Sequence, residues 1–269
     1  MRLFLEVAFK NLYYFISNVH YRTFYILLVR FGNKQRYQAL NTKVNKYYLY
    51  IPDALSFIWQ YKEIFVDESY RFNAKGSGGV IIDCGANIGL SGLFFKSNYP
   101  NHKLYCIEAD PKIADVMRRN FMNNSVEAEI IAKAAWINNE GVSFDSEGSD
   151  SGSVKSGDSN NAVKIESIDF NEFLMGFEKI DFLKMDIEGA ENIVIPTCVE
   201  GLKKVEHLFL EYHSSYNDSQ ELPNLLNILK ESGFHFYIKN ENKRKSPFLN
   251  LHKDRAYDLQ LNIYAYRKA

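Results

Sequence analysis

Short apolar runs recur along the chain from residue 80 onward. Three of them are Val80–Asp83, Leu104–Glu108 and Glu129–Trp136, and two more follow at Ile180–Asp186 and Val205–Tyr212. Apolar runs of about four to eight residues between turn signals are typical of parallel strands that are buried on both faces. The pattern therefore predicts five such strands.

Helical segments separate these runs. Leu90–Ser97 has helical spacing and stops before Pro100. A second helix is expected to start at Asp110, the N-cap, with Pro111 at its first position. Asn224–Ser232 carries leucines on one face. Alternating strands and helices predict a doubly wound α/β domain, with a mostly parallel sheet covered by helices on both faces.

The last two strands show a different pattern. Phe234–Lys239 and Leu259–Tyr266 alternate apolar with polar residues. Such alternation is typical of strands with one solvated face. We therefore expect a C-terminal antiparallel strand pair.

The N-terminal part is rich in aromatic residues and lacks the strand–helix alternation. We interpret residues 1–45 as helices, residues 46–52 as a short strand and residues 56–65 as a further helix. A glycine-rich break follows. We therefore divide the chain into an N-terminal helical extension, residues 1–75, and an α/β domain, residues 76–269.

The first helix is expected to be amphipathic. Leu5, Phe9, Leu12, Ile16 and Val19 recur at helical spacing, while charged side chains interrupt the run and exclude a membrane-spanning helix. Two interpretations stay open. In the first, the apolar face packs against the domain, or against a second copy in a homo-oligomer. In the second, it makes a peripheral contact with a membrane surface.

Charge and cysteine content narrow the functional class. The formal net charge of −1 gives no general attraction for nucleic acid or an anionic membrane. The three cysteines, Cys84, Cys106 and Cys198, fit no zinc-binding spacing. Because the N-terminus also lacks a signal-peptide cleavage site, we expect reduced thiols in a cytoplasmic protein.

One segment is too polar to form a core. Gly141–Asn161 consists mainly of Ser, Gly, Asp and Asn. We expect a mobile loop there. Long loops in compact domains often serve as lids over a site, and a tolerated surface insertion is the alternative.

The segment after the first strand has the character of a cofactor-binding loop. The strand ends at Asp83, glycines follow at Gly85 and Gly89, and a helix begins at once. Glycines let a ligand approach the backbone, and the helix N-terminus presents free N–H groups to an anion such as a carboxylate. A nicotinamide site would require G-x-G-x-x-G, with glycine at Asn87. The charge of Asp83 would also oppose a pyrophosphate but tolerate a sulfonium.

Glu108 ends the second strand, 19 residues after Gly89. An acidic residue at this place typically accepts hydrogen bonds from ribose hydroxyls. We therefore add it to the candidate cofactor site.

Further acidic residues cluster at the ends of the fourth and fifth strands. Asp186, Glu188 and Glu191 crowd three carboxylates into six residues, although Glu188 and Glu191 could simply open a helix. Glu211 and His213 share one face of the next strand. His213 is a candidate general base, oriented by Asp186 and Glu211, and the same three could hold a divalent cation. We favour the metal-free route, because hard-cation sites usually have more carboxylates.

These segments together resemble the FkbM family of methyltransferases. The similar stretches are FIWQYKEIF, ESYRF, IIDCGANIGLSG, CIEADP, FLKMDIEGAE and FLEYH, which extend over about residues 46–266. The resemblance implies a class I (Rossmann-like) methyltransferase fold, S-adenosyl-L-methionine as methyl donor, and O-methylation of a sugar or natural product. The candidate cofactor-binding residues are Asp83, Gly85, Ala86, Asn87, Gly89, Glu108 and Asp186.

Two other functions stay open. The chain could be a non-catalytic cofactor-binding module that assembles through its aromatic N-terminus, although an intact catalytic set argues against this. Nucleic-acid methylation is suggested by a short basic patch, although the overall charge disfavours it. The patch consists of Lys243, Arg244, Lys245, His252, Lys253 and Arg255, beside Phe248.

Overall fold

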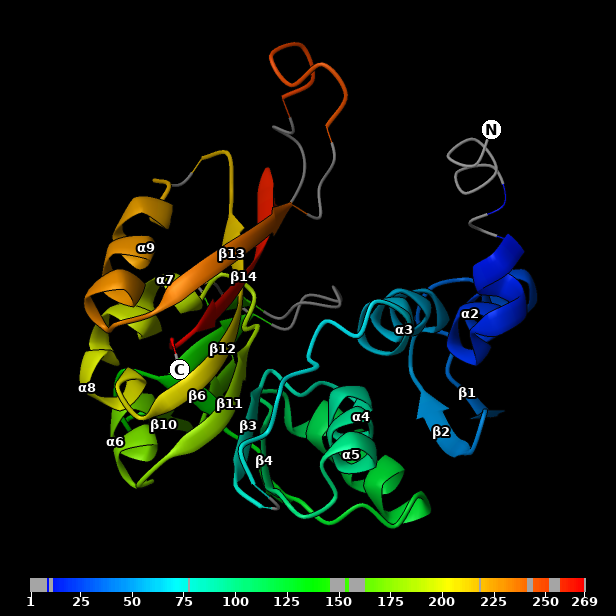
Figure 1. Ribbon diagram of the computed structural model, residues 1–269, viewed down its shortest axis with the longest axis horizontal. Helices are drawn as coiled ribbons and strands as arrows, with labels where there is room; N and C mark the ends of the chain where they lie inside the picture. The colour runs from blue at the N-terminus through cyan, green and yellow to red at the C-terminus, as the bar shows by residue number, and fades with distance from the viewer. Residues whose placement is uncertain are drawn as a thin grey trace.

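The computed structural model describes residue 9 and residues 12–76, 78–145, 153–154, 163–217, 219–240, 244–251 and 257–268. Its centre is a seven-stranded sheet in the order β13-β14-β12-β11-β3-β4-β5 (Figure 1). The strands are β3 (Val80–Cys84), β4 (Lys103–Ile107), β5 (Glu129–Ile131), β11 (Ile180–Met185), β12 (Val205–Ser214), β13 (His235–Asn240) and β14 (Leu259–Tyr266).

The pairing directions confirm the predicted doubly wound fold. β12, β11, β3, β4 and β5 pair in parallel, and β14 pairs antiparallel with both β12 and β13. All six residues of β11 are buried, as expected for a central strand with helices on both faces.

Helices cover both faces of the sheet (Figure 1). One face carries α4 (Leu90–Asn98) and α5 (Pro111–Asn123); α5 has the predicted Asp110 N-cap, whose side chain accepts from the Lys112 N–H. The other face carries α6 (Phe170–Met175), α7 (Glu191–Val194), the 3₁₀ turn η2 (Ile195–Thr197), α8 (Val199–Leu202) and α9 (Leu222–Glu231). Each face has its own hydrophobic core.

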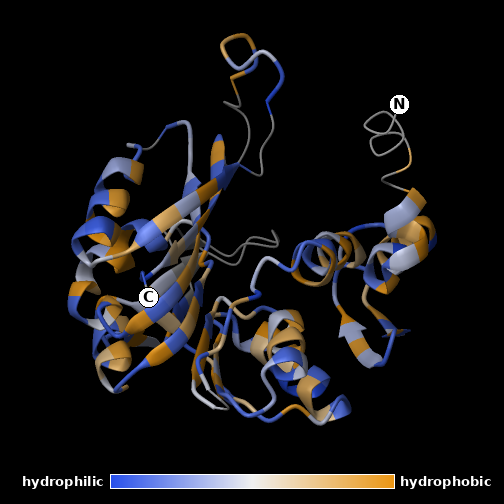
Figure 2. Ribbon diagram, in the orientation of Figure 1, coloured by the Kyte–Doolittle hydropathy of each residue, from blue (hydrophilic) through white to orange (hydrophobic). Residues whose placement is uncertain are grey.

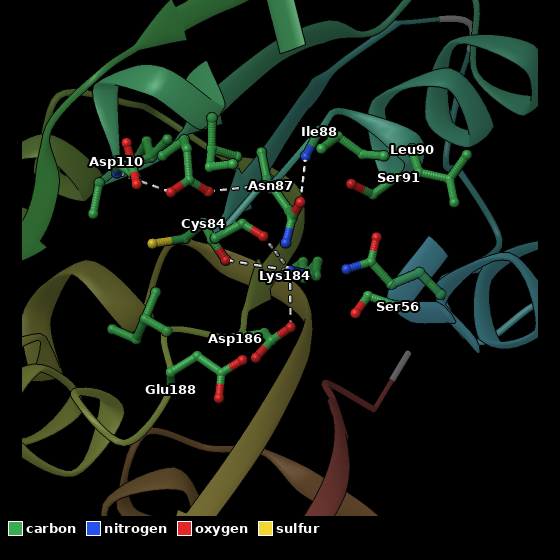
Figure 3. A pocket seen from close by; sticks show the side chains of 18 of the residues that line it. Ser56, Cys84, Asn87, Ile88, Leu90, Ser91, Asp110, Lys184, Asp186 and Glu188 are labelled. Carbon is green, nitrogen blue, oxygen red and sulfur yellow. Dashed lines mark hydrogen bonds and ion pairs between the residues drawn. The ribbon is translucent and has the colours of Figure 1, made fainter. Parts of the chain in front are cut away.

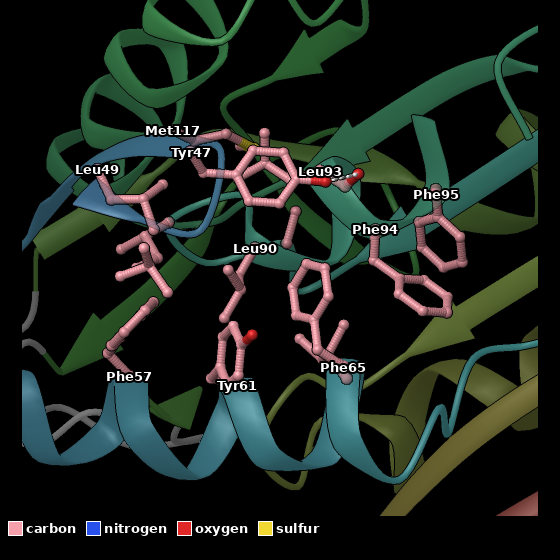
Figure 4. Close-up of a cluster of buried hydrophobic side chains, with 14 of the residues drawn as sticks. Tyr47, Leu49, Phe57, Tyr61, Phe65, Leu90, Leu93, Phe94, Phe95 and Met117 are labelled. Atoms are coloured by element: carbon pink, nitrogen blue, oxygen red, sulfur yellow. Dashed lines mark hydrogen bonds between the residues drawn. The ribbon is translucent and has the colours of Figure 1, made fainter. Parts of the chain in front are cut away.

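The N-terminal segment packs into the core on the α4 face. α3 (Ala54–Tyr61), capped by Asp53, continues into the π-helical turn η1 (Lys62–Val66). Phe57, Tyr61 and Phe65 point from these turns toward Leu90 and Phe94 (Figure 4). Residues on both sides of the expected boundary at residue 75 therefore share one core. Within the described residues, no helix has both the length and the apolar character needed to cross a membrane.

The prediction that residues 1–45 are entirely helical is wrong. The described part contains α2 (Val19–Phe31) but also the strand β1 (Leu40–Val44). β1 forms an antiparallel hairpin with β2 (Tyr47–Ile51), which lies within the strand expected at 46–52. The hairpin is possible because Asn45 takes a left-handed conformation with φ 51°.

The third predicted strand is broken in two. β5 stays in the central sheet, whereas β6 (Ala134–Trp136) leaves it and pairs in parallel with β10 (Ser167–Asp169). Ala134 donates its backbone N–H to Glu166, which draws this segment away from the sheet edge.

The expectation of a loop over Gly141–Asn161 is also partly wrong. β7 (Val142–Asp145) pairs antiparallel with β8 (Ser153–Val154) and with β9 (Val163–Ile165). Residues 146–152 and 155–162 lie outside the described residues. A role as a lid or an insertion therefore stays a prediction.

Candidate active site

The candidate site lies at the carboxyl end of the central strand β3, where the connections of the chain lead to opposite sides of the sheet. β3 lies between β4 and β11, and the loops after β3 and β11 face each other. The Asp186 N–H donates to the Cys84 carbonyl at 3.1 Å, which joins the two loops. In open α/β sheets, such a switch point is where ligands bind.

Two glycines are required in the loop after β3. Gly85 has φ 80°, and a Cβ there would lie 1.8 Å from the Asp186 carbonyl oxygen. Gly89 has φ 85°, and its Cβ would lie 2.5 Å from the Phe121 ring. The Gly85 and Ala86 N–H groups donate to the Ile107 carbonyl at 2.9 and 3.0 Å, which fixes the loop over the end of β4.

Glu108 connects this loop to the next one. Its Oε2 accepts from the Asn87 N–H at 2.8 Å, and its Oε1 accepts from the Asp110 N–H at 3.0 Å. Burial raises the pKa of Glu108, and the two backbone donors oppose that rise. Each carboxylate oxygen keeps a second lone pair for a ligand.

A cavity of about 540 Å³ lies over these loops. Cys84, Asn87 and Ile88 lie on one side of it and Asp186 and Glu188 on another (Figure 3). Gly85, Ala86 and Glu108 also line it. The third side comes from the N-terminal segment, which contributes Ser56, Gln60 and Glu63. The volume is in the range of small-molecule and cofactor sites.

Asp83 and Gly89, both predicted to bind the cofactor, do not line this cavity. Asp83 is fully buried behind the loop, where Ser91 donates a hydrogen bond to it. Gly89 packs against α5. Both residues therefore support the conformation of the loop after β3 from the side away from the cavity.

Lys184 is a central residue of the site that the sequence analysis did not single out. Its Nζ donates to the Gly85 carbonyl at 2.8 Å and lies 3.6 Å from Asp83 and 3.4 Å from Asp186. Burial lowers the pKa of Lys184, but the carboxylates of Asp186 and Asp83 outweigh it, so the pKa is raised. The signal in the sequence was a lysine near the end of a strand predicted to be buried on both faces.

Lys184→Met is expected to destabilise the protein by about 3 kcal/mol, because Asp83 would stay buried without its cation. Urea denaturation measures the loss. Lys179→Met is the matched control, since Lys179 is 45% exposed in its ion pair with Asp181. Its effect should stay below about 1 kcal/mol. A loss below about 1 kcal/mol for Lys184→Met as well would contradict this structural role.

The structure brings the three predicted catalytic residues together. One ligand atom each of Asp186, Glu211 and His213 lies within 4.8 Å of the others. His213 Nε2 is 3.6 Å from Glu188 and 3.7 Å from Glu211. Asp186 and Glu188 face the cavity, whereas Glu211 and His213 are buried behind them.

Glu191 holds His213 from behind. Its Oε1 accepts from the His213 backbone N–H at 2.8 Å and lies 3.0 Å from His213 Nδ1. Its Oε2 accepts from the Gly189 N–H at 2.8 Å. Glu191 is the first residue of α7, as the sequence analysis allowed. It is also fully buried against the imidazole.

The surrounding carboxylates change the protonation of the cluster. Burial lowers the pKa of His213, but Glu191, Glu211 and Glu188 outweigh it and raise the pKa to about 10. Burial and the charge of Asp186 raise the pKa of Glu188 to about 7, against the opposing effect of His213. Burial and Asp186 also raise the pKa of Glu211 well above its usual value. At neutral pH the imidazole is therefore protonated.

One aromatic and one amide side chain, Tyr257 and Gln260, complete the cluster. The ring of Tyr257 lies 4.5 Å from the His213 ring, and its hydroxyl donates to the Glu188 carbonyl at 3.1 Å. Gln260 donates a hydrogen bond to Glu211. These partners come from the approach to β14 and from β14 itself, and no motif in the sequence pointed to them.

The basic patch is only partly described. Arg244 donates to the Asp258 carbonyl and lies 4.0 Å from the Asp258 carboxylate, so this charge is tied to the protein itself. Lys243, His252, Lys253 and Arg255 lie outside the described residues.

Residues 83–236 match the model of the methyltransferase FkbM domain. The chain belongs to the FkbM family of methyltransferases. The matched FkbM domain begins at the end of β3 and includes both the glycine-containing loop and the acidic cluster. It does not include α3, which supplies the third wall of the cavity.

Two methyltransferases are similar in sequence to this FkbM chain. Methyltransferase sdnD from Sordaria araneosa is 26% identical over 214 residues, which cover 65% of this chain and 80% of the relative. The 2-O-methyltransferase NoeI from Sinorhizobium fredii is 26% identical over 165 residues, 54% of this chain and 67% of the relative. Among solved structures, M. jannaschii TYW2 in complex with AdoMet aligns over 87% of this chain and 89% of its own, with 11% identity and a TM-score of 0.46.

Proposed function

We propose that the chain is an S-adenosylmethionine-dependent O-methyltransferase whose acceptor is a polyhydroxylated molecule, such as a sugar or a glycosylated natural product. One observation carries the proposal. The carboxylates of Asp186 and Glu188 face the same cavity as the glycine-containing loop and Glu108. A proton acceptor thus lies beside the place where a methyl donor would bind.

The cofactor would lie across the loop after β3. Glu108 would accept hydrogen bonds from the ribose hydroxyls, as acidic residues at this strand end do. Gly85, Ala86 and Asn87 let the cofactor approach the backbone. The negative charge of Asp186 would stabilise the cationic amino and sulfonium groups of the donor.

Glu188 rather than His213 would accept the acceptor's proton. His213 is buried and, with its pKa raised to about 10, already protonated at neutral pH. Glu188 lines the cavity and has a pKa of about 7, which suits a general base. It also has φ 55°, a strained conformation for a non-glycine residue that is common at functional sites.

The reaction then has a simple balance. The acceptor oxygen attacks the methyl carbon, a C–O bond forms, and the S–CH₃ bond breaks with its electron pair going to sulfur. The hydroxyl proton passes to Glu188. S-adenosylhomocysteine and a methyl ether are the products, and positioning of the two reactants supplies much of the rate.

The third wall of the cavity supports a hydroxyl-rich acceptor. Ser56, Gln60 and Glu63 lie at helical spacing and all face the cavity. Hydroxyl, amide and carboxylate groups together donate and accept hydrogen bonds, as a polyol requires. The name of NoeI, a 2-O-methyltransferase, also favours transfer to oxygen.

Transfer of a tritiated methyl group from S-adenosylmethionine to a panel of free sugars, sugar nucleotides and glycosides tests this function. We expect a labelled product whose methyl group NMR places on oxygen. A methyl group on nitrogen or carbon would contradict O-methylation. Transfer to RNA or DNA but to no hydroxylated small molecule would favour the nucleic-acid alternative. Cofactor binding without turnover on any acceptor would favour a non-catalytic module.

A divalent cation is the alternative to direct base catalysis. Asp186, Glu211 and His213 offer two carboxylates and an imidazole close enough to share one ion, so the donor set fits. A bound cation would lower the pKa of the acceptor hydroxyl. The steps above need only the residues of the chain.

A further inference from the structure

The N-terminal helical region exposes several large apolar side chains that the described protein does not cover. We call this set the outer N-terminal face; it consists of Tyr13, Ile16, Val19, Tyr25, Ile26 and Val29. Ile16 and Val29 are 67% and 87% exposed. Contiguous apolar surfaces on proteins usually mark a contact with a partner or a membrane.

The helix that carries most of this face is already docked on its other side. Phe24 and Leu27 of α2 are buried in the core, and Phe24 packs against Trp59 of α3 at 5.8 Å between ring centroids. His20 of α2 lies in hydrogen-bond contact with the Tyr61 hydroxyl at 2.7 Å. α2 is thus apolar on both sides, whereas a surface helix normally has a polar outer side. Figure 2 shows several apolar positions along this helix.

Positive charge accompanies the outer N-terminal face. Residues 1–50 contain eight Lys and Arg residues and a single acidic residue, whereas the remainder contains 24 and 32. Arg30, the next residue after Val29, and Lys34, in the turn beyond α2, are exposed, and the ion pairs of the described residues leave both without a carboxylate partner. The near-zero net charge of the chain therefore conceals a strongly basic end.

We propose that the outer N-terminal face docks on an anionic lipid bilayer, with α2 lying in the plane of the headgroups. Exposed tyrosines and aliphatic residues with flanking Lys and Arg suit this position. Each basic side chain near an anionic membrane surface adds to the attraction.

The positive charge around the outer N-terminal face also disfavours a second copy of the chain as its binding partner. A two-fold dimer brings the same surface of both copies together. Such a dimer would gather the basic side chains of both copies, including both Arg30 and both Lys34 residues, at one interface and concentrate the positive charge. A bilayer with anionic headgroups instead neutralises it. The proposal does not depend on the methyltransferase reaction.

Sedimentation of the full-length chain with vesicles tests the proposal. We expect binding to vesicles of phosphatidylcholine and phosphatidylglycerol, little binding to phosphatidylcholine alone, and weaker binding as salt is raised. The double variant Ile26→Glu and Val29→Glu should partition at least about tenfold less, because it places two carboxylates in the contact. Met122→Glu is the control, since Met122 is 77% exposed on α5, outside this face. It should bind as the wild type does.

The folded state is checked by binding of S-adenosylhomocysteine, which the double variant should retain. Absence of wild-type binding to anionic vesicles would overturn the proposal. So would equal binding by the double variant and the wild type. A dimer in analytical ultracentrifugation that the double variant abolishes, with no vesicle binding, would assign the face to a second copy instead.

Discussion

Gly85→Val is expected to abolish cofactor binding. The Cβ of any side chain at this position would lie 1.8 Å from the Asp186 carbonyl oxygen, far inside van der Waals contact. Backbone on both sides of the switch point would have to move apart, and the left-handed conformation with φ 80° would add strain. Isothermal titration with S-adenosylhomocysteine should show an affinity at least about 100-fold below wild type, a loss of about 3 kcal/mol.

Gly76→Val is the matched control, because Gly76 also has a positive φ, 107°, but no atom lies within 4 Å of its added Cβ. It should bind like the wild type and show only the cost of backbone strain. Because Gly85→Val could also reduce folding, Glu108→Ala provides a second test. It removes the acceptor that orders the Asn87 N–H and should weaken binding with the fold intact. Wild-type affinity in both variants would refute the proposed cofactor site.

The placement of the candidate site could be predicted because it depends on strand ends. Asp186 follows β11, and Glu211 and His213 end β12; these strands are parallel neighbours, so their carboxyl ends meet. The apolar runs locate such ends without knowledge of the loops. Glu108 was found in the same way, one strand beyond Gly85.

The supporting residues could not be predicted because their partners are distant in sequence. Lys184 pairs with Asp83 and holds the Gly85 carbonyl about 100 residues away. Glu191 meets His213 only because α7 packs beside β12. A single sequence shows that a lysine interrupts an apolar run, but it does not show which carboxylate neutralises the buried charge of that lysine.

The errors in the fold have a similar cause. β1 was missed because three consecutive polar residues, Asn41, Thr42 and Lys43, give it no strand-like alternation. The strand forms by pairing with β2 across a two-residue turn. β6 was merged with β5 because the apolar run continues, and only its pairing with β10 separates the two. Local pattern predicts that a segment is extended, whereas its partner is decided by the packing of the whole domain.

Glu188→Gln is expected to lower turnover by about two to four orders of magnitude on whichever acceptor the panel identifies, with cofactor affinity unchanged. The amide keeps the size of the side chain but cannot accept the proton. In the wild type, kcat/KM should fall below a pH of about 7, where Glu188 becomes protonated and loses its function as a base. That acidic limb should disappear in Glu188→Gln. Glu200→Gln, at an exposed ion pair with Lys203, is the control.

His213→Gln distinguishes the two candidates for the base. The imidazolium lowers the pKa of Glu188, so its removal should move the acidic limb to higher pH while measurable turnover remains. If His213 were the base, as the sequence suggested, this variant would instead lose turnover by orders of magnitude, and Glu188→Gln would keep it. Chelation adds the last distinction. Direct base catalysis is insensitive to EDTA, whereas loss of turnover in EDTA with recovery in Mg²⁺ or Mn²⁺ would assign Asp186, Glu211 and His213 to a cation and exclude the direct route.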